Sequence, residues 1–95
     1  MADDAQATAD AVRAACARRV RDLLQKRVGA GREDPRRALS DEASIANDWK
    51  ADSFDRLQLV LDIEETFDIG VSDEEAETID TIDAAVTRIM SGAWT

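Results

Sequence analysis

Ser53 is the residue of this 95-residue chain whose position most favours chemistry. It follows Asp52 at the end of a polar stretch, and an amphipathic run from Phe54 to Phe67 starts directly after it. A serine at a predicted helix N-terminus exposes its hydroxyl, and the free backbone N–H groups there stabilise an anionic substituent. Three interpretations follow: a helix cap, a regulatory phosphoserine, or a residue that a separate enzyme modifies.

The residue types that are missing exclude most catalytic sites. The chain contains no histidine and no tyrosine, and Cys16 is its only cysteine. Nucleophiles that depend on a histidine base are therefore excluded, as are most zinc sites and any internal disulfide. The four acids between residues 73 and 77 lack the spacing and the glycine of an EF-hand loop. We therefore expect no metal site and no catalysis by this chain alone.

The elements that must position Ser53 are predicted to be helices. Apolar residues recur at steps of three and four from roughly Asp10 to Val28, where Gly29 follows, and residues 1–9 either extend this helix or fray. The run from Phe54 to Phe67 predicts a central helix, which Asp52 can cap together with Asp55. On a helical wheel its broad apolar side comprises Leu57, Leu59, Val60, Leu61, Ile63 and Phe67.

The remaining elements are shorter. The long connection from Gly29 to Lys50 should place Ala38-Leu39, Ala43 to Ile45 and Trp49 onto the core, with the Trp49 indole N–H near solvent or a polar partner. Ser72 to Glu75 forms a capping box for a short helix ending near Thr78. A last helix is expected from Thr81 to Met90, capped by Asp80 or Thr81 and ended by Gly92. Residues 91–95 then form a tail, in which Trp94 either packs back or trails. We predict one all-α domain, residues 1–95.

Charge is divided unevenly along the chain. Residues 1–37 contain nine Lys+Arg against six Asp+Glu, whereas residues 38–95 contain three against fifteen, which gives the net charge of −9. The acidic part should attract basic partner surfaces and repel nucleic acid and anionic membranes. No apolar run approaches the length of a membrane span, and no secretory signal is visible at the N-terminus. We expect a cytoplasmic monomer that binds no nucleic acid and does not insert into membranes.

The chain resembles the acyl carrier protein family in the segment Asp52-Ser53-Phe54-Asp55 and in the apolar and acidic run from Leu57 to Asp68 that follows it. The similarity extends through the acidic segment 73–79 and covers about residues 18–90. It implies a four-helix bundle with a short third helix and a long loop between the first and second helices. It also implies that a phosphopantetheinyl transferase attaches 4′-phosphopantetheine from coenzyme A to Ser53, with Asp52 as the flanking residue of the motif. The terminal thiol then holds acyl groups as thioesters.

The resemblance also implies partner enzymes and a binding site for cargo. Acyl-transferring and chain-modifying enzymes with basic docking patches would contact the second helix. The partner-binding residues on that helix would be Asp55, Gln58, Asp62, Glu64 and Glu65. If the bundle shelters acyl chains, the lining residues would be Leu57, Ile63, Phe67, Val71, Ile79, Ala85 and Ile89, whose alternative role is ordinary core packing.

Several residues depart from the family pattern around the serine. Lys50 stands where the family usually has glycine, Trp49 and Phe54 replace leucines, and Gln58 replaces an acid, while Arg56 adds a positive charge. These departures favour a specialised carrier for a dedicated pathway, such as an unusual lipid, a polyketide or an aminoacyl intermediate. We expect its specificity to reside at Trp49, Lys50 and Gln58. The alternative is an acidic helical adaptor that has the same fold and acts through protein contacts without the arm.

Overall fold

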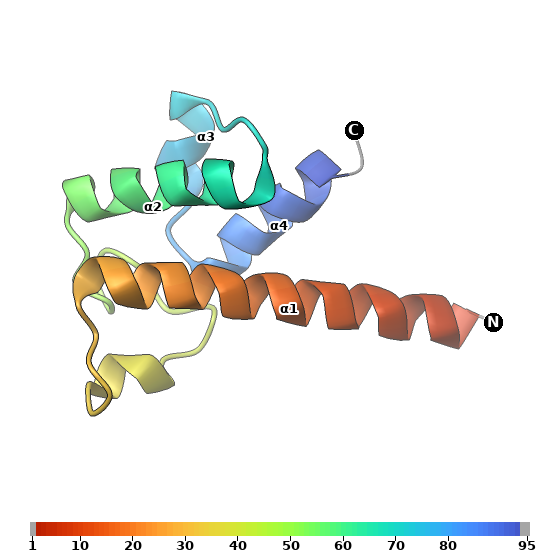
Figure 1. Ribbon diagram of the computed structural model, residues 1–95, viewed down its shortest axis with the longest axis horizontal. Helices are drawn as coiled ribbons and strands as arrows, with labels where there is room; N and C mark the ends of the chain where they lie inside the picture. Colours follow the sequence, from red (N-terminus) through yellow and green to blue (C-terminus); the bar gives the residue numbers. More distant parts are fainter. Residues whose placement is uncertain (1, 94–95) are drawn as a thin grey trace.

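The computed structural model describes residues 2–93, and within that range the chain forms helices and no strands. The elements are α1 (Ala2–Val28), the 3-10 helix η1 (Pro35–Ala38), α2 (Ser53–Phe67), α3 (Asp73–Thr78) and α4 (Ile82–Ala93). In Figure 1, α1 runs along the molecule, α2 and α4 lie against it, and the short α3 crosses near α2. The expected all-α bundle with a short third helix is confirmed.

The long helix α1 begins at Ala2, so residues 2–9 are helical. Its N-terminal turns run beyond the other helices in Figure 1. Val12 of this helix is 46% exposed. The helix ends as predicted, because Gly29 adopts a left-handed φ of 68° and the Ala30 N–H donates to the Gln25 carbonyl at 2.9 Å.

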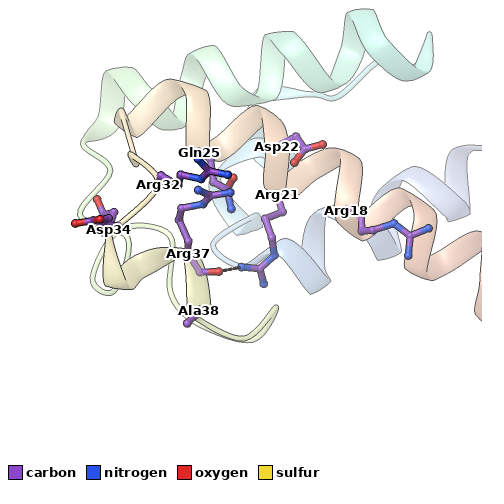
Figure 2. A pocket seen from close by; sticks show the side chains of 9 residues that line it. Arg18, Arg21, Asp22, Gln25, Arg32, Asp34, Arg37 and Ala38 are labelled. Carbon is purple, nitrogen blue, oxygen red and sulfur yellow. Dashed lines mark hydrogen bonds between the residues drawn. The ribbon is translucent and has the colours of Figure 1, made fainter.

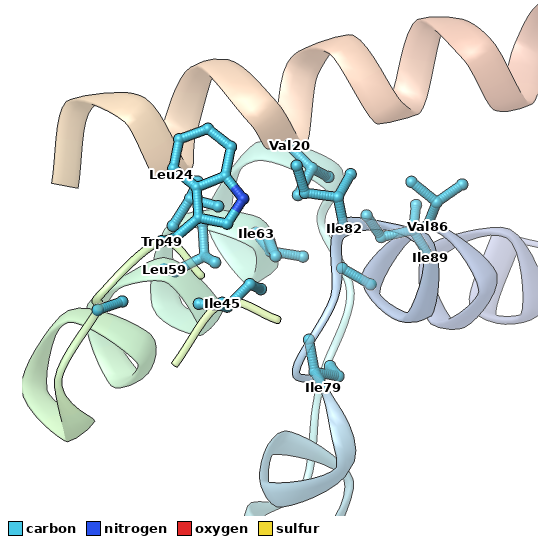
Figure 3. Close-up of a cluster of buried hydrophobic side chains, with 12 residues drawn as sticks. Val20, Leu24, Ile45, Trp49, Leu59, Ile63, Ile79, Ile82, Val86 and Ile89 are labelled. Atoms are coloured by element: carbon cyan, nitrogen blue, oxygen red, sulfur yellow. The ribbon is translucent and has the colours of Figure 1, made fainter. Parts of the chain in front are cut away.

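The core lies where the inner faces of α1, α2 and α4 meet the connection between α1 and α2 (Figure 3). Its largest fully buried side chains are Trp49, Leu24, Ile45, Leu59, Ile63, Ile82, Val20 and Val86. The connection contributes Ile45 and Trp49 as predicted, whereas Ala38 is exposed on η1 and does not reach the core. The long connection is therefore an ordered part of the bundle.

The apolar side of α2 is narrower than the wheel predicted. Leu59, Val60 and Ile63 are buried, but Leu57 and Leu61 are 52% and 47% exposed. The wheel was wrong for these two leucines: Leu57 borders an open hollow between α2 and α3, and Leu61 is also left about half exposed. Of the residues suggested to line a cargo cavity, Ile63, Ile79, Ala85 and Ile89 belong to the buried core. Phe67 and Val71 pack at its edge, and Leu57 faces solvent.

Side-chain oxygens cap the N-termini of α3 and α4. The predicted capping box of α3 is present, with Ser72 Oγ accepting from the Glu75 N–H at 3.1 Å. Thr81 caps α4 by accepting from the Ala84 N–H at 2.9 Å. The expected end of α4 was wrong, because the helix continues through Ala93 and Gly92 lies inside it. The tail therefore starts later than residue 91, and Trp94 lies outside the described residues.

Candidate functional site

Ser53 is the first residue of α2, and its side chain is exposed. The capping role belongs to Asp52, whose Oδ1 accepts from the Asp55 N–H at 2.8 Å, while the Asp55 carboxylate accepts from the Asp52 N–H at 3.4 Å. This reciprocal capping box satisfies the helix end without the serine hydroxyl. The choice between Asp52 and Ser53 as the cap is therefore decided for Asp52, and Ser53 Oγ remains free to react.

Comparison with the other serines shows how unusual this hydroxyl is. Ser40, Ser44 and Ser72 each accept a hydrogen bond from a backbone N–H that their position in a turn or cap provides. Within the described residues, the hydroxyls of Ser53 and Ser91 form no hydrogen bond. Ser91 lies in the last turn of α4, where the helix dipole disfavours an anionic substituent. Ser53 alone combines a free hydroxyl with the positive end of a helix.

The residues just before Asp52 are fixed by contacts on both sides of Lys50. Arg36 Nη1 donates to the Trp49 carbonyl at 2.6 Å, and the Ala51 N–H donates to the Ile45 carbonyl at 3.1 Å. Between these two anchors Lys50 adopts a φ of 61°, in the left-handed region that favours glycine. The chain must turn sharply here to bring Ser53 to the surface. Glycine, which the resemblance to the acyl carrier protein family implies at this position, would adopt this geometry without steric cost.

Trp49 is completely buried, so it cannot contact a partner directly. The expectation that its indole N–H would lie near solvent or a polar partner was wrong, because Nε1 is buried and has no hydrogen-bond partner. The Arg21 guanidinium lies 5.7 Å from the ring centroid and pairs with Asp41 at 2.7 Å. Trp49 therefore supports from inside the residues 49–52 that lead to Ser53, which we call the serine loop. Sequence reasoning did not identify Arg21 and Arg36, because nothing local marks their partners.

A hollow of about 330 Å³ lies beside Ser53, between α2 and α3. Its lining combines apolar and charged side chains: Ser53, Arg56, Leu57, Val60, Asp73, Ala76 and Glu77. Arg56 occupies the gap between the helices and donates from Nη2 to the Ile79 carbonyl at 3.2 Å, with Asp80 Oδ1 4.0 Å from Nε. Its charge therefore lies at the C-terminal, negative end of α3.

Asp62 is the acid of α2 that the fold engages most strongly. Arg27 of α1 donates to both of its carboxylate oxygens, from Nε at 2.6 Å and from Nη2 at 2.8 Å. The hydrogen bond to Asp62 raises the pKa of the Arg27 guanidinium. An enzyme that used Asp62 as a docking contact would therefore have to share it with Arg27.

The other predicted partner-binding residues differ in exposure. Glu64 accepts from the Val71 N–H at 3.3 Å and is half-buried, as is Gln58. Asp55 is engaged in the capping box, and Glu65 is exposed. Their contact with partners stays a prediction. The exposed apolar side chains of α2, which are Phe54, Leu57 and Leu61, provide a second kind of surface near Ser53.

The chain matches the family model described as the phosphopantetheine attachment site over residues 18–89. It therefore belongs to this family of carrier domains, whose members bear a covalently attached 4′-phosphopantetheine group. The matched range contains α2 and the serine loop, together with the C-terminal part of α1. The exposed, unbonded hydroxyl at a helix N-terminus fits such a group, because a phosphodiester there is an anion beside free N–H groups. Carrier domains of this kind interact with the transferase that modifies them and with the enzymes that use the arm.

Two further observations concern the described residues alone. No helix among them is both long enough and apolar enough to cross a membrane. Among the side chains that the structure describes, the acids of α3 do not gather with others into a group that could bind a metal ion.

Proposed function

We propose that Ser53 is the residue that receives 4′-phosphopantetheine, and that the protein carries acyl groups as thioesters on that arm. The observation that carries this proposal is the division of roles at the start of α2, where Asp52 caps the helix and Ser53 Oγ is exposed and unbonded. Within the family match, no other described serine has a free hydroxyl. The Asp-Ser motif, the helix dipole and the family membership support the same residue.

The chemistry of attachment needs only one group from this chain. Ser53 Oγ would form the new bond to the β-phosphorus of coenzyme A, and the bond from that phosphorus to 3′,5′-ADP would break. A base of the transferase would accept the hydroxyl proton, since the chain has no histidine to do so. The protein contributes the exposed nucleophile, a rigid loop that presents it, and free N–H groups of α2 that stabilise the resulting phosphodiester. The arm, once attached, supplies a thiol for thioester formation.

We further propose that the carrier serves a dedicated pathway in specialised lipid, fatty-acid or polyketide-type biosynthesis. An enzyme acting at Ser53 meets Phe54 and Leu57 beside it, which are 65% and 52% exposed. Exposed Glu65 lies on the same helix and offers a contact for a basic docking patch. A partner surface that matched this helix would therefore need both an apolar area and cations.

The decisive experiment is intact-mass analysis of the apo protein after incubation with coenzyme A and a promiscuous phosphopantetheinyl transferase. We expect a mass gain of one phosphopantetheine group in the unmodified chain and no gain in Ser53→Ala. Ser91→Ala is the matched control, because Ser91 is also exposed on a helix and should leave the gain intact. A gain that survived Ser53→Ala, or no gain with several transferases, would contradict the proposal.

The result also separates the carrier from the adaptor interpretation. An adaptor without the arm requires Ser53→Ala to preserve function in the native host, whereas a carrier requires its complete loss. Mass spectrometry of the protein isolated from that host would then identify the acyl species and the class of pathway.

A further inference from the structure

The arginines and lysines of this acidic protein gather in one region. Eight of its twelve Lys+Arg lie in residues 18–37, where only three acids occur, so this segment has a charge of +5 and the rest of the chain −14. The segment comprises the C-terminal part of α1, the turn after it and most of η1. Figure 1 shows α2 and η1 on opposite sides of α1.

Two adjoining hollows, of about 590 and 330 Å³, mark the surface of this segment, and they share Asp22, Gln25 and Arg37. We call the two together the basic hollow. Its charged lining residues are Arg18, Arg19, Arg21, Asp22, Lys26, Arg32, Glu33, Asp34 and Arg37. In Figure 2, Arg18, Arg21 and Gln25 project from α1, and Arg37 extends from η1 toward Gln25. The Arg21 guanidinium donates to the Arg37 carbonyl at 3.2 Å and so ties the two sides together.

Most cations of the basic hollow have no partner among the residues that the structure describes. Five of them are exposed and make no ion pair or side-chain hydrogen bond within the described residues: Arg18, Arg19, Lys26, Arg32 and Arg37. Every described arginine outside the hollow pairs with a carboxylate, namely Arg13, Arg27, Arg36, Arg56 and Arg88. The chain thus pairs its described arginines elsewhere and leaves those of the hollow available, except Arg21, which pairs with Asp41.

Solubility does not account for these free cations. A net charge of −9 already keeps a small protein dispersed, and cations only reduce that charge. The eighteen acids outside residues 18–37 could have paired with them, but the fold keeps most of those acids on other elements. Five unpaired, exposed cations in a concave surface create a local positive potential that attracts negative groups.

We propose that the basic hollow is a docking surface for an acidic segment of a partner protein. Its length favours a protein over a small anion, because Arg18 to Lys26 spans about 12 Å of helix. Leu23, Ala30 and Ala38 add apolar contact area. No lining residue of the basic hollow belongs to α2, the helix that begins with Ser53.

The test uses the full chain and a fluorescein-labelled helical peptide in which glutamate alternates with alanine, followed by fluorescence anisotropy. We expect saturable binding that weakens as salt increases. The triple variant Arg18→Ala/Arg32→Ala/Arg37→Ala should weaken binding about tenfold, the loss expected for three exposed ion pairs. The control Asn47→Asp/Lys50→Glu lowers the net charge by the same three units away from the hollow and should bind within about twofold of the unmodified chain.

Several outcomes would overturn the proposal. Equal weakening by the triple variant and the control would show that only net charge matters. Complete displacement of the peptide by equimolar inorganic triphosphate would indicate a small-anion site, and tighter binding of a DNA duplex than of the peptide would indicate a nucleic-acid surface. Self-association by light scattering that the triple variant abolishes would assign the hollow to a second copy of this chain. Circular dichroism of the triple variant checks that it folds, as expected for exposed residues.

Discussion

Replacing Lys50 by glycine should stabilise the protein, because the fold forces this residue into the left-handed conformation. A non-glycine residue there costs roughly 1–2 kcal/mol of conformational energy. Glycine avoids this cost but makes the unfolded chain more flexible, which costs about 0.4–1 kcal/mol. The Lys50 side chain is exposed and forms no hydrogen bond or ion pair within residues 2–93, so no contact is lost. We expect a net gain of about 0.5–1 kcal/mol in the free energy of unfolding.

For a domain of this size, that gain corresponds to an increase in Tm of about 2–8 °C, measured by thermal unfolding with circular dichroism. Lys50→Ala is the matched control, because it removes the charge and the long side chain but keeps the unfavourable conformation. Lys50→Asn should lie between glycine and alanine, since asparagine tolerates left-handed geometry better than other residues. If glycine and alanine gave the same Tm, or if glycine lowered it, the reasoning about this turn would be refuted.

Two further predictions concern α2 and the loop beneath it. Leu59→Ala should lower the free energy of unfolding by about 2–5 kcal/mol, because the Leu59 side chain is 1% exposed. Leu57→Ala should lower it by less than about 1 kcal/mol, because Leu57 is 52% exposed. Urea unfolding of both variants measures these losses, and equal losses would contradict the assignment of Leu59 to the buried face and Leu57 to the exposed face. Hydrogen bonds from Arg36 lower the pKa of Asp34 from 3.8 to about 2, so its charged form is favoured in the folded state. The stability that this pair contributes should be present above about pH 4 and lost as the pH falls toward 2, and Asp34→Asn should remove this part of the pH dependence. Unfolding followed by the fluorescence of Trp49, whose carbonyl Arg36 contacts, gives the measurement, and an unchanged pH profile in the variant would argue against the pairing.

What lies close together in the sequence was predictable from the sequence. The capping boxes at Asp52 and Ser72, the short α3 and the stop at Gly29 depend on residues within a few positions of each other, and all were confirmed. The position of Ser53 at the start of α2 follows from the same local signals. That Ser53 takes no part in this cap was decided only by the structure, because two adjacent polar side chains can compete for the same N–H groups.

What depends on distant partners was decided only by the tertiary structure. Periodicity placed Leu57 on the apolar side of α2, but in the fold its side chain borders an open hollow between α2 and α3 and stays exposed. The arginine that pairs with Asp62 is 35 residues away, and the one that binds the Trp49 carbonyl is 13 residues away. No local pattern specifies such pairs, because they form only when the chain folds over itself.

Lys50 shows most clearly what the sequence predicted and what only the tertiary structure decided. By itself the sequence predicted that a serine with an exposed hydroxyl follows a polar loop, and the resemblance to the acyl carrier protein family implied glycine where Lys50 stands. Only the fold shows why that matters: anchors at Trp49 and Ala51 fix the peptide units on both sides and leave Lys50 in the left-handed region. A backbone angle is set by the contacts that surround it, and those contacts come from η1 and the turn at Ile45.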